Sequence, residues 1–298
     1  MIICQTIAEV KSHISNYRME QGQQAKVGFV PTMGFLHEGH ASLLRRSKQE
    51  CGLTVLSIFV NPLQFGPNED FDRYPRDEER DLQVARQEGA DVVFMPSVRE
   101  MYPVPAKTRV LVSGVTERLC GASRPGHFDG VGTVVSKLFH IVGPDRAYFG
   151  LKDAQQVAVI TTMVRDLNMP VEIVPCETVR EQDGLALSSR NVYLSPEQRM
   201  QAVVLSQALA LAGQLAAKST LGADELQRRL SEYITAEAPI AVIDYVEVLS
   251  YPDLEQLQPG EPLGSVGGSW IVALAVKFGT TRLIDNRLFW AKEVSSHV

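Results

Sequence analysis

Two of the chain's six histidines stand three residues apart in PTMGFLHEGH, which runs from Pro31 to His40. This stretch lies where an apolar run gives way to a helical pattern. Gly34 and Gly39 would let the backbone approach a ligand closely, and a helix that begins near His40 would aim its N–H groups at an anion. Two imidazoles there can donate to phosphate oxygens, above all to charge that grows in a transition state. The stretch therefore predicts a phosphate-binding turn, with a purely structural turn as the alternative.

Three other interpretations of this turn fit less well. Gly34 and Gly39 are five residues apart, and no G-x-G-x-x-G dinucleotide fingerprint is present here. A phosphate loop of the G-x-x-x-x-G-K-S/T type would match both glycines, but His40 and Ala41 stand where Lys and Ser or Thr belong. His37 and His40 could form half of a zinc site, although the sequence offers no obvious third ligand nearby.

Two later segments carry groups that suit a nucleotide. FGLKDAQQ begins at Phe149, and its Lys152 would extend beyond a strand end as a mobile positive charge for a phosphate. The following Asp153 can also simply cap the next helix. VREQDGLALSSRN begins at Val179, and its two serines followed by Arg190 form a reasonable triphosphate clamp. A serine-rich connector is the alternative for this second segment.

Polar side chains that suit a small substrate occur in three further places. FVNPLQF, which ends at Phe65, closes a strand with Asn, Gln and an aromatic ring. The amides of Gln155 and Gln156, in the first turn of a helix, could reach a hydroxyl or a carboxylate. RPGHFDG, which begins at Arg124, could form a basic flap or only a tight turn before a helix.

Strands and helices that alternate along roughly the first 175 residues are expected to position these segments. The patterns predict strands at Val27–Pro31, Leu53–Val60, Asp91–Met95, Arg146–Phe149 and Val171–Pro175, and helices at Ala41–Glu50, Asp77–Glu88, Gly132–Val142 and Ala154–Leu167. Short apolar strands that alternate with helices are typical of a parallel sheet covered on both faces. We therefore expect an α/β, Rossmann-like, doubly wound domain over residues 1–178, whose ligands bind beyond the carboxyl ends of the strands.

The pattern changes in the rest of the chain. Helices are predicted at Pro196–Lys218 and Ala223–Ala236, followed by strands at Ile243–Leu249, Trp270–Phe278 and Thr281–Asp285. Helices followed by strands indicate a smaller α+β domain over residues 179–298. We expect this domain to act as a lid over the site.

Composition narrows the class of protein. The formal charge of −6 gives no general reason to expect nucleic-acid binding. The four cysteines are far apart, which disfavours a disulfide framework or a zinc ribbon and favours free thiols in a reducing cytoplasm. The N-terminus lacks the pattern of a signal peptide, and no window approaches the roughly 18 apolar residues of a membrane helix. We expect a soluble cytoplasmic protein without a membrane partner.

Read together and in order, these motifs resemble the pantothenate synthetases, the pantoate–β-alanine ligases of coenzyme A biosynthesis. The resemblance rests on PTMGFLHEGH, FVNPLQF, YPRDEERD, RPGHFDGV, FGLKDAQQ and VREQDGLALSSRN, and it is dense from about Lys26 to Tyr193. The family belongs to a nucleotidyltransferase superfamily in which His-x-Gly-His and a Lys- and Ser-rich second motif bind ATP.

The resemblance implies roles for individual residues. It implies that His40 is the acid/base residue, with His37 and Lys152 as its catalytic partners on the phosphates. The implied ATP contacts are Met33, Gly34, Phe35, Leu36, His37, Glu38, Gly39, His40, Gly150, Leu151, Lys152, Asp153, Val179, Leu187, Ser188, Ser189 and Arg190. Gln64 and Gln156 match pantoate-binding positions, Gln64 also suits β-alanine, and Arg124 is a further substrate contact on a loop expected to move.

The resemblance implies ATP-dependent condensation of (R)-pantoate with β-alanine through pantoyl-adenylate, with Mg²⁺ on the ATP phosphates and no resident metal. It also implies a homodimer. The alternatives are another nucleotidyltransferase of the same superfamily, which would transfer AMP to a phosphate acceptor, and a catalytically dead nucleotide-binding protein. The net negative charge and the compact second domain disfavour an aminoacyl-tRNA synthetase.

Overall fold

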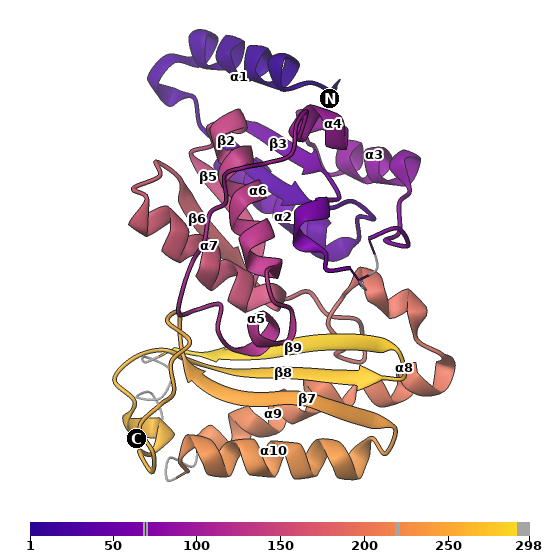
Figure 1. Ribbon diagram of the computed structural model, residues 1–298, viewed down its shortest axis with the longest axis vertical. Coiled ribbons are helices and arrows are strands. Elements are labelled where there is room, and N and C mark those ends of the chain that lie inside the picture. The colour runs from indigo at the N-terminus through magenta and orange to yellow at the C-terminus, as the bar shows by residue number, and fades with distance from the viewer. Residues whose placement is uncertain (68, 70, 218–220, 291–298) are drawn as a thin grey trace. The chain divides into compact units, whose positions relative to one another are not determined.

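The computed structural model describes residues 1–67, 69, 71–217 and 221–290. It divides into two compact units (Figure 1). The first unit comprises Met1–Ser113, Arg124–Leu151 and Val159–Glu177, and the second comprises Gly114–Ser123, Lys152–Ala158 and Thr178–Val298. The expected domain boundary after residue 178, and the expected action of the smaller domain as a lid, stay predictions.

The first unit is built on a six-stranded parallel sheet with the order β1-β4-β3-β2-β5-β6. Its strands are β1 (Ile2–Cys4), β2 (Val27–Thr32), β3 (Leu53–Ile58), β4 (Val92–Phe94), β5 (Arg146–Gly150) and β6 (Glu172–Cys176). From β2 the chain adds β3 and β4 on one side, and it later adds β5 and β6 on the other. The strand order therefore reverses between β2 and β5, which is where an open parallel sheet binds its ligands.

Helices cover both faces of this sheet. They are α1 (Ile7–Gln21), α2 (Glu38–Glu50), α3 (Glu78–Gln87), α4 (Val98–Met101), α6 (His127–Val142) and α7 (Ala154–Asp166), of which α7 begins in the second unit. Successive residues of β2 face opposite sides, because side chains alternate along a strand. Phe29 contacts Phe139 of α6 edge to face at 6.4 Å, whereas Val30 packs in a cluster with Leu44 of α2. This packing on both faces confirms the doubly wound α/β fold.

The second unit contains a three-stranded antiparallel sheet with the order β7-β8-β9 (Figure 1). Its strands are β7 (Ala241–Ser250), β8 (Trp270–Phe278) and β9 (Thr281–Phe289), and its helices are α5 (Leu119–Ser123), α8 (Pro196–Ala202), α9 (Val204–Ala216) and α10 (Ala223–Glu237). Leu209 of α9, Leu230 of α10 and Val272 of β8 are buried in one core cluster. Helices packed on an antiparallel sheet confirm the smaller α+β fold.

Three of the predicted elements differ most from the structure. The helix expected over Pro196–Lys218 is interrupted at Val203, whose N–H bonds to the Gln201 carbonyl instead of continuing the helical ladder; Lys218 itself lies outside the described residues. Helix α6 begins five residues earlier than expected, after Gly126 in the left-handed region at φ 80°. Strand β9 continues to Phe289, because the Phe289 ring stacks on Trp270 with centroids 3.9 Å apart.

Candidate functional site

The turn between β2 and α2 is held by a buried carboxylate from another helix. Asp81 of α3 is 2% exposed, and its two oxygens accept the backbone N–H groups of Phe35 at 2.8 Å and Leu36 at 2.6 Å. Burial raises the pKa of Asp81, and these two amide bonds oppose that rise. Gly34 and Phe35 both lie in the left-handed region, with φ of 85° and 51°. The turn is therefore a fixed conformation that Asp81 helps to define.

The two histidines are locked against the start of α2. His37 is the N-cap residue, and its Nδ1 accepts the Gly39 N–H at 3.1 Å. His40 Nδ1 in turn accepts the His37 N–H at 3.3 Å, and the two rings are 4.1 Å apart between centroids. An imidazole nitrogen that accepts a hydrogen bond carries no proton, so the neutral form of each ring has its proton on Nε2. In its neutral form each ring can therefore donate a hydrogen bond only from Nε2.

Other residues of this turn are placed in different surroundings. Leu36 is fully buried in the core, so a contact from this residue to a nucleotide would come from its main chain. Glu38 is exposed and forms an ion pair with Arg45 of the same helix. Met33 is half-buried, and its sulfur accepts the Gln64 amide at 3.1 Å. The turn and the FVNPLQF segment are therefore in direct contact through Met33 and Gln64.

Asn61 organises the FVNPLQF segment. Its side chain is 1% exposed, and its Nδ2 donates to Gln64 Oε1 at 3.3 Å and to the Gly130 carbonyl at 3.2 Å. The Tyr102 hydroxyl donates to Asn61 Oδ1 at 2.9 Å. Asn61 therefore orients the Gln64 amide in the 3-10 helix η2 (Pro62–Gln64). The sequence grouped Asn61 with the polar side chains that suit a small substrate; its role in orienting Gln64 was not predicted, and the signal for it is an Asn-Pro pair directly after a buried strand.

Arg124 lies beside the same segment. It forms a bidentate ion pair with Glu69, with Nε–Oε1 at 2.7 Å and Nη2–Oε2 at 2.6 Å. This contact lowers the pKa of Glu69. His127 Nδ1–H donates to the Gln64 carbonyl at 2.8 Å and its Nε2 accepts from Arg124 at 3.0 Å, because Arg124 can only donate. Arg124 Nη2 also donates directly to the Gln64 carbonyl at 3.4 Å, so Arg124 and Gln64 are linked both directly and through His127.

In the second unit, VREQDGLALSSRN forms a hairpin followed by a 3-10 helix. The Leu187 N–H donates to the Val179 carbonyl at 3.0 Å, which places these two expected ATP contacts opposite each other. The Ser188 hydroxyl accepts the Arg190 N–H at 3.2 Å and caps the 3-10 helix η4 (Ser189–Tyr193). Ser188 therefore has a local structural role as the cap of η4, and its contact with phosphate stays a prediction.

Lys152 and Ser188 line one small cavity of the second unit. Asn191 and Asp285 line it as well, and Asn191 Oδ1 is buried there without a hydrogen-bond partner. The Lys152 ammonium lies 3.7 Å from the Asp153 carboxylate, and both residues belong to the 3-10 helix η3 (Leu151–Asp153). The structure thus brings Lys152 and the start of the serine segment together.

The two neighbouring glutamines of α7 have different environments. Gln155 is 7% exposed, and its Nε2 donates to the carbonyls of Val115 at 2.9 Å and Arg118 at 2.8 Å. Gln155 is therefore a structural residue that holds the segment before α5. Gln156 is half-buried.

Gly150, the last residue of β5, and Leu151, which follows it, lie at the same sheet edge as the histidine turn. Strands β2 and β5 are parallel neighbours, with Gly28 paired with Arg146 and Phe29 with Ala147. The carboxyl ends of both strands therefore lie side by side. The turn that follows β2 and the start of the FGLKD segment therefore lie at one edge of the sheet.

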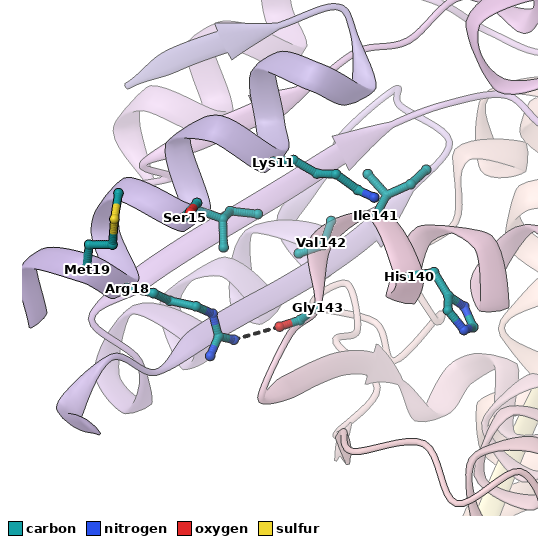
Figure 2. A pocket seen from close by; sticks show the side chains of 9 residues that line it. Lys11, Ser15, Arg18, Met19, His140, Ile141, Val142 and Gly143 are labelled. Carbon is teal, nitrogen blue, oxygen red and sulfur yellow. Dashed lines mark hydrogen bonds between the residues drawn. The ribbon is translucent and has the colours of Figure 1, made fainter. Parts of the chain in front are cut away.

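A separate cavity lies in the first unit, between α1 and the end of α6 (Figure 2). It has a volume of about 410 Å³, and none of the expected site residues lines it. Arg18 on its wall donates to the Gly143 carbonyl at 2.7 Å and pairs with Asp145 at 3.0 Å. The Arg18 guanidinium is therefore occupied by contacts at the C-terminal end of α6. We assign this cavity no part in the site.

Two general properties of the described residues complete this description. No group of three or more His, Cys, Asp and Glu side chains is arranged there to hold a metal ion, and no helix in the described ranges is long and apolar enough to cross a membrane. Cys4, Cys51, Cys120 and Cys176 are all buried free thiols, as the sequence predicted.

Comparison with known proteins agrees with the motifs. The family model described as pantoate-beta-alanine ligase matches residues 2–288. A pantothenate synthetase from Geobacillus thermodenitrificans is 56% identical over 286 residues, which cover 96% of each chain. The crystal structure of pantothenate synthetase from Thermus thermophilus superposes with a TM-score of 0.87 at 46% identity, over 96% of this chain and 99% of that one.

A further structure is similar over 98% of each chain, with a TM-score of 0.75 and 34% identity. It is a pantoate-beta-alanine ligase from Francisella tularensis complexed with beta-gamma ATP and beta-alanine. A family match over nearly the whole length, relatives above half identity and the same fold all agree. The chain belongs to the pantoate–β-alanine ligase family.

Proposed function

We propose that the chain catalyses the ATP-dependent condensation of (R)-pantoate with β-alanine to pantothenate, with release of AMP and pyrophosphate. The observation that carries this proposal is the position of two motifs on one sheet edge. The histidine turn follows β2, Gly150 ends β5, and these adjacent parallel strands flank the point where the strand order reverses. Family membership supports the substrates, since a relative of this chain is a ligase complexed with β-alanine and an ATP species.

Activation of pantoate is the first step. The pantoate carboxylate attacks the α-phosphorus of ATP, so a new P–O bond forms as the bond to the pyrophosphate leaving group breaks. Negative charge grows on the α-phosphate oxygens, and fixed donors aimed at that charge lower the barrier. His40 and His37 have their Nδ1 atoms bound to backbone N–H groups, which suits both for donation from Nε2 to these oxygens. ATP enters as its Mg²⁺ complex.

We propose further phosphate contacts from residues of the second unit. Lys152 supplies a positive charge, and Ser188, Ser189 and Arg190 supply hydroxyl and guanidinium donors. The remaining ATP contacts that we propose are Met33, Gly34, Phe35, Leu36, Glu38, Gly39, Gly150, Leu151, Asp153, Val179 and Leu187. Lys152 and Ser188 line the same cavity, which supports their action on one ligand.

Pantoate is proposed to bind through the amides of Gln64 and Gln156, with Arg124 as a further contact. Gln64 is suited to this task because Asn61 and Met33 fix both ends of its amide. In the second step the β-alanine amine attacks the acyl carbon of pantoyl-adenylate, forms the amide bond, loses a proton and expels AMP. The enzyme positions the reactants and neutralises charge, and the scheme needs no covalent enzyme intermediate.

The proposal is tested by following both halves of the reaction. With pantoate and ATP alone, the purified chain should exchange labelled pyrophosphate into ATP, and AMP should appear in quantity only when β-alanine is added. An adenylated product that persists in the presence of β-alanine would instead indicate a nucleotidyltransferase that stops after AMP transfer. Absence of pantoate-dependent exchange would contradict the proposed function.

We also propose that the protein works as a cytoplasmic homodimer. The four free thiols fit a reducing compartment, and the homodimer follows from the family resemblance. Sedimentation equilibrium should give a mass near twice 32.9 kDa, and a mass of one chain at micromolar concentration would contradict the dimer.

A further inference from the structure

We infer that Asp285 and Asn286 of β9 are positioning residues for the adenylation step. They hold, from two adjacent positions on one strand, both segments of the second unit that are expected to touch the ATP phosphates. These segments are the turn with Lys152 and the serine segment Ser188–Arg190. The inference rests on the proposed function, because it concerns how that function's ATP contacts are held in place.

Asp285 occupies a position where the strand pattern calls for an apolar residue. Thr281, Leu283, Asp285 and Phe289 are the buried residues of β9, and Leu283 and Phe289 belong to the hydrophobic core of the unit. The Asp285 residue is 2% exposed. A buried carboxylate is unfavourable unless it is paired and hydrogen-bonded. Asp285 therefore needs a specific partner at this buried position of β9.

That partner is Arg180, which reaches Asp285 with both guanidinium arms. Nη1 lies 2.6 Å from Oδ2, and Nη2 lies 2.9 Å from Oδ1. Bidentate geometry of this kind fixes direction as well as distance. Arg180 Nη1 also donates to the Gly184 carbonyl at 3.0 Å. The Arg180 side chain therefore contacts both the turn of its own hairpin and strand β9.

The hairpin leads directly into the serine segment. Arg180 is bridged to Ala186 across the hairpin, and the next pair of the hairpin, Val179 and Leu187, is joined by a backbone hydrogen bond of 3.0 Å. Ser188 follows Leu187 without an intervening residue. The position of Ser188 on the second unit is therefore set by the attachment of Arg180 to Asp285.

The second attachment runs through the next residue of β9. Asp285 Oδ1 accepts the Asn286 N–H at 2.8 Å, and Asn286 Nδ2 donates to the Lys152 carbonyl at 2.9 Å. This bond fixes the main chain from which the Lys152 side chain extends. Asp285, Lys152 and Ser188 also line the same cavity, so the two attachments meet at one place.

A purely stabilising role explains these contacts less well. Replacing a buried ion pair by apolar residues is often neutral or stabilising, so such a pair is weak evidence for stability alone. Here the two contacts reach two segments, distant in sequence, whose side chains must meet one phosphate chain at a defined separation. Reaction rates depend steeply on such positioning.

The first variant to test is Asn286→Ala, which removes the amide donor from a half-buried position and leaves the Asp285–Arg180 pair in place. The second is Arg180→Lys, which keeps a positive charge near Asp285 but cannot form the bidentate contact. Pyrophosphate exchange with pantoate should slow by roughly 10- to 100-fold in each, a span set by the cost of misplacing reacting groups. The β-alanine-dependent release of AMP from supplied pantoyl-adenylate should stay within about 3-fold of the wild-type rate, because the triphosphate contacts are no longer used.

Leu226→Ala is the matched control for stability. Leu226 is a fully buried residue of α10 in the same core cluster, and its truncation loosens the second unit without touching either attachment. It should lower the melting temperature at least as much as Asn286→Ala does while leaving pyrophosphate exchange unchanged. If Leu226→Ala slows exchange as much as the two network variants, or if both half-reactions slow equally in those variants, the positioning role is wrong.

The wild-type protein and Lys152→Ala separate this inference from the proposed function. If the wild type shows no pantoate-dependent exchange, the proposed function fails and the inference fails with it. If the wild type is active, Lys152→Ala is inactive and both network variants exchange at the wild-type rate, the proposed function stands and the positioning role alone is refuted.

Discussion

The carboxylate of Asp81 accepts the backbone N–H of Leu36 at 2.6 Å, across 45 residues of sequence. Its other oxygen accepts the next N–H toward the N-terminus, that of Phe35, at 2.8 Å. Both bonds lie at a place where the backbone adopts left-handed conformations. A buried carboxylate thus sets the path of the chain just before the two histidines.

Replacing Asp81 by Asn should therefore impair both stability and adenylation. The amide keeps the shape of the carboxylate, but its NH₂ group must face one of two N–H donors, which leaves that donor unsatisfied. The expected loss is about 1–3 kcal/mol in the free energy of unfolding, with pantoate-dependent pyrophosphate exchange lowered on the order of 10-fold or more. Urea unfolding and exchange kinetics measure the two effects.

Asp77→Asn is the matched control for Asp81→Asn. Asp77 is the exposed N-cap of the same helix, and Asn caps helices about as well as Asp. This variant should resemble the wild type in both assays. Equal behaviour of the two variants would show that the buried contact has no special part in holding the turn.

Sequence periodicity predicted the parts of the fold that depend on local pattern. The strand that ends at Thr32, the strand that ends at Gly150 and the helices after them follow from short apolar runs and amphipathic spacing, as found. Once these strands are known to be parallel neighbours, the positions of the histidine turn and of the FGLKD segment follow.

Long-range contacts were not predictable in this way. Asp81 belongs to a helix whose many charges indicate a solvated surface, and its burial follows only from the packing of that helix against the turn. Gln155 looked like a possible substrate ligand, but two carbonyls about 40 residues earlier occupy its amide. The start of α6 was misplaced because the glycines in RPGHFDGVG suggest a turn. In the structure Gly130 lies inside the helix, where the absence of a side chain allows close contact with Leu63 and Gln64.

The roles of the two histidines can be tested with variants that keep the hydrogen bond made by Nδ1 but remove Nε2. An Asn side chain can place an acceptor near the position of Nδ1 but offers nothing at Nε2. We expect His40→Asn to keep the bond to the His37 N–H and to melt close to the wild type, while adenylation falls by roughly 10²–10⁴-fold, the usual span for losing an acid/base or charge-stabilising group. His40→Ala should be equally inactive and less stable.

His37→Asn provides the same comparison at the helix cap. Asn is a favourable N-cap residue, so helix α2 should keep its stability, whereas His37→Ala should lose about 0.5–2 kcal/mol. Adenylation should fall in both variants. If His37→Asn adenylates pantoate near the wild-type rate and only His37→Ala is impaired, this histidine serves only as the helix cap.

Gly130 should be needed for pantoate binding although it contacts no substrate in the proposed scheme. A Cβ at this position would lie 2.3 Å from the Leu63 carbonyl oxygen and 2.6 Å from the Gln64 Cα, so Gly130→Ala must displace the segment that carries Gln64. We expect the KM for pantoate to rise on the order of 10-fold with little change in the KM for ATP.

Gly132→Ala, in the same helix, is the control for Gly130→Ala. Its added Cβ would meet the Val110 carbonyl oxygen at 3.1 Å, a tight but smaller conflict away from Gln64. Both variants gain about 1 kcal/mol of helix propensity, so the difference between them reports the displacement alone. A pantoate KM that is the same in the two variants would contradict the role given to Gly130.

The Glu69–Arg124 ion pair should make a pH-dependent contribution to the stability of the first unit. The hydrogen bonds from Arg124 lower the pKa of Glu69 below its ordinary value of 4.5. A carboxyl group whose pKa is lower in the folded state stabilises the fold above its unfolded-state pKa, and this contribution disappears as the pH falls through the folded-state value. The deficit of Glu69→Gln relative to the wild type should therefore be constant from pH 7 to about pH 5 and should shrink below pH 4.5.

Urea unfolding at a series of pH values measures this difference. Glu20→Gln, a change at an exposed residue of α1, serves as the control and should stay close to the wild type throughout. The series should run from pH 7 to pH 3, so that it spans both the range of constant deficit and the range in which Glu69 becomes protonated. A Glu69→Gln deficit that grows on acidification, or that stays unchanged down to pH 3, would show that the ion pair is not the source of the lowered pKa.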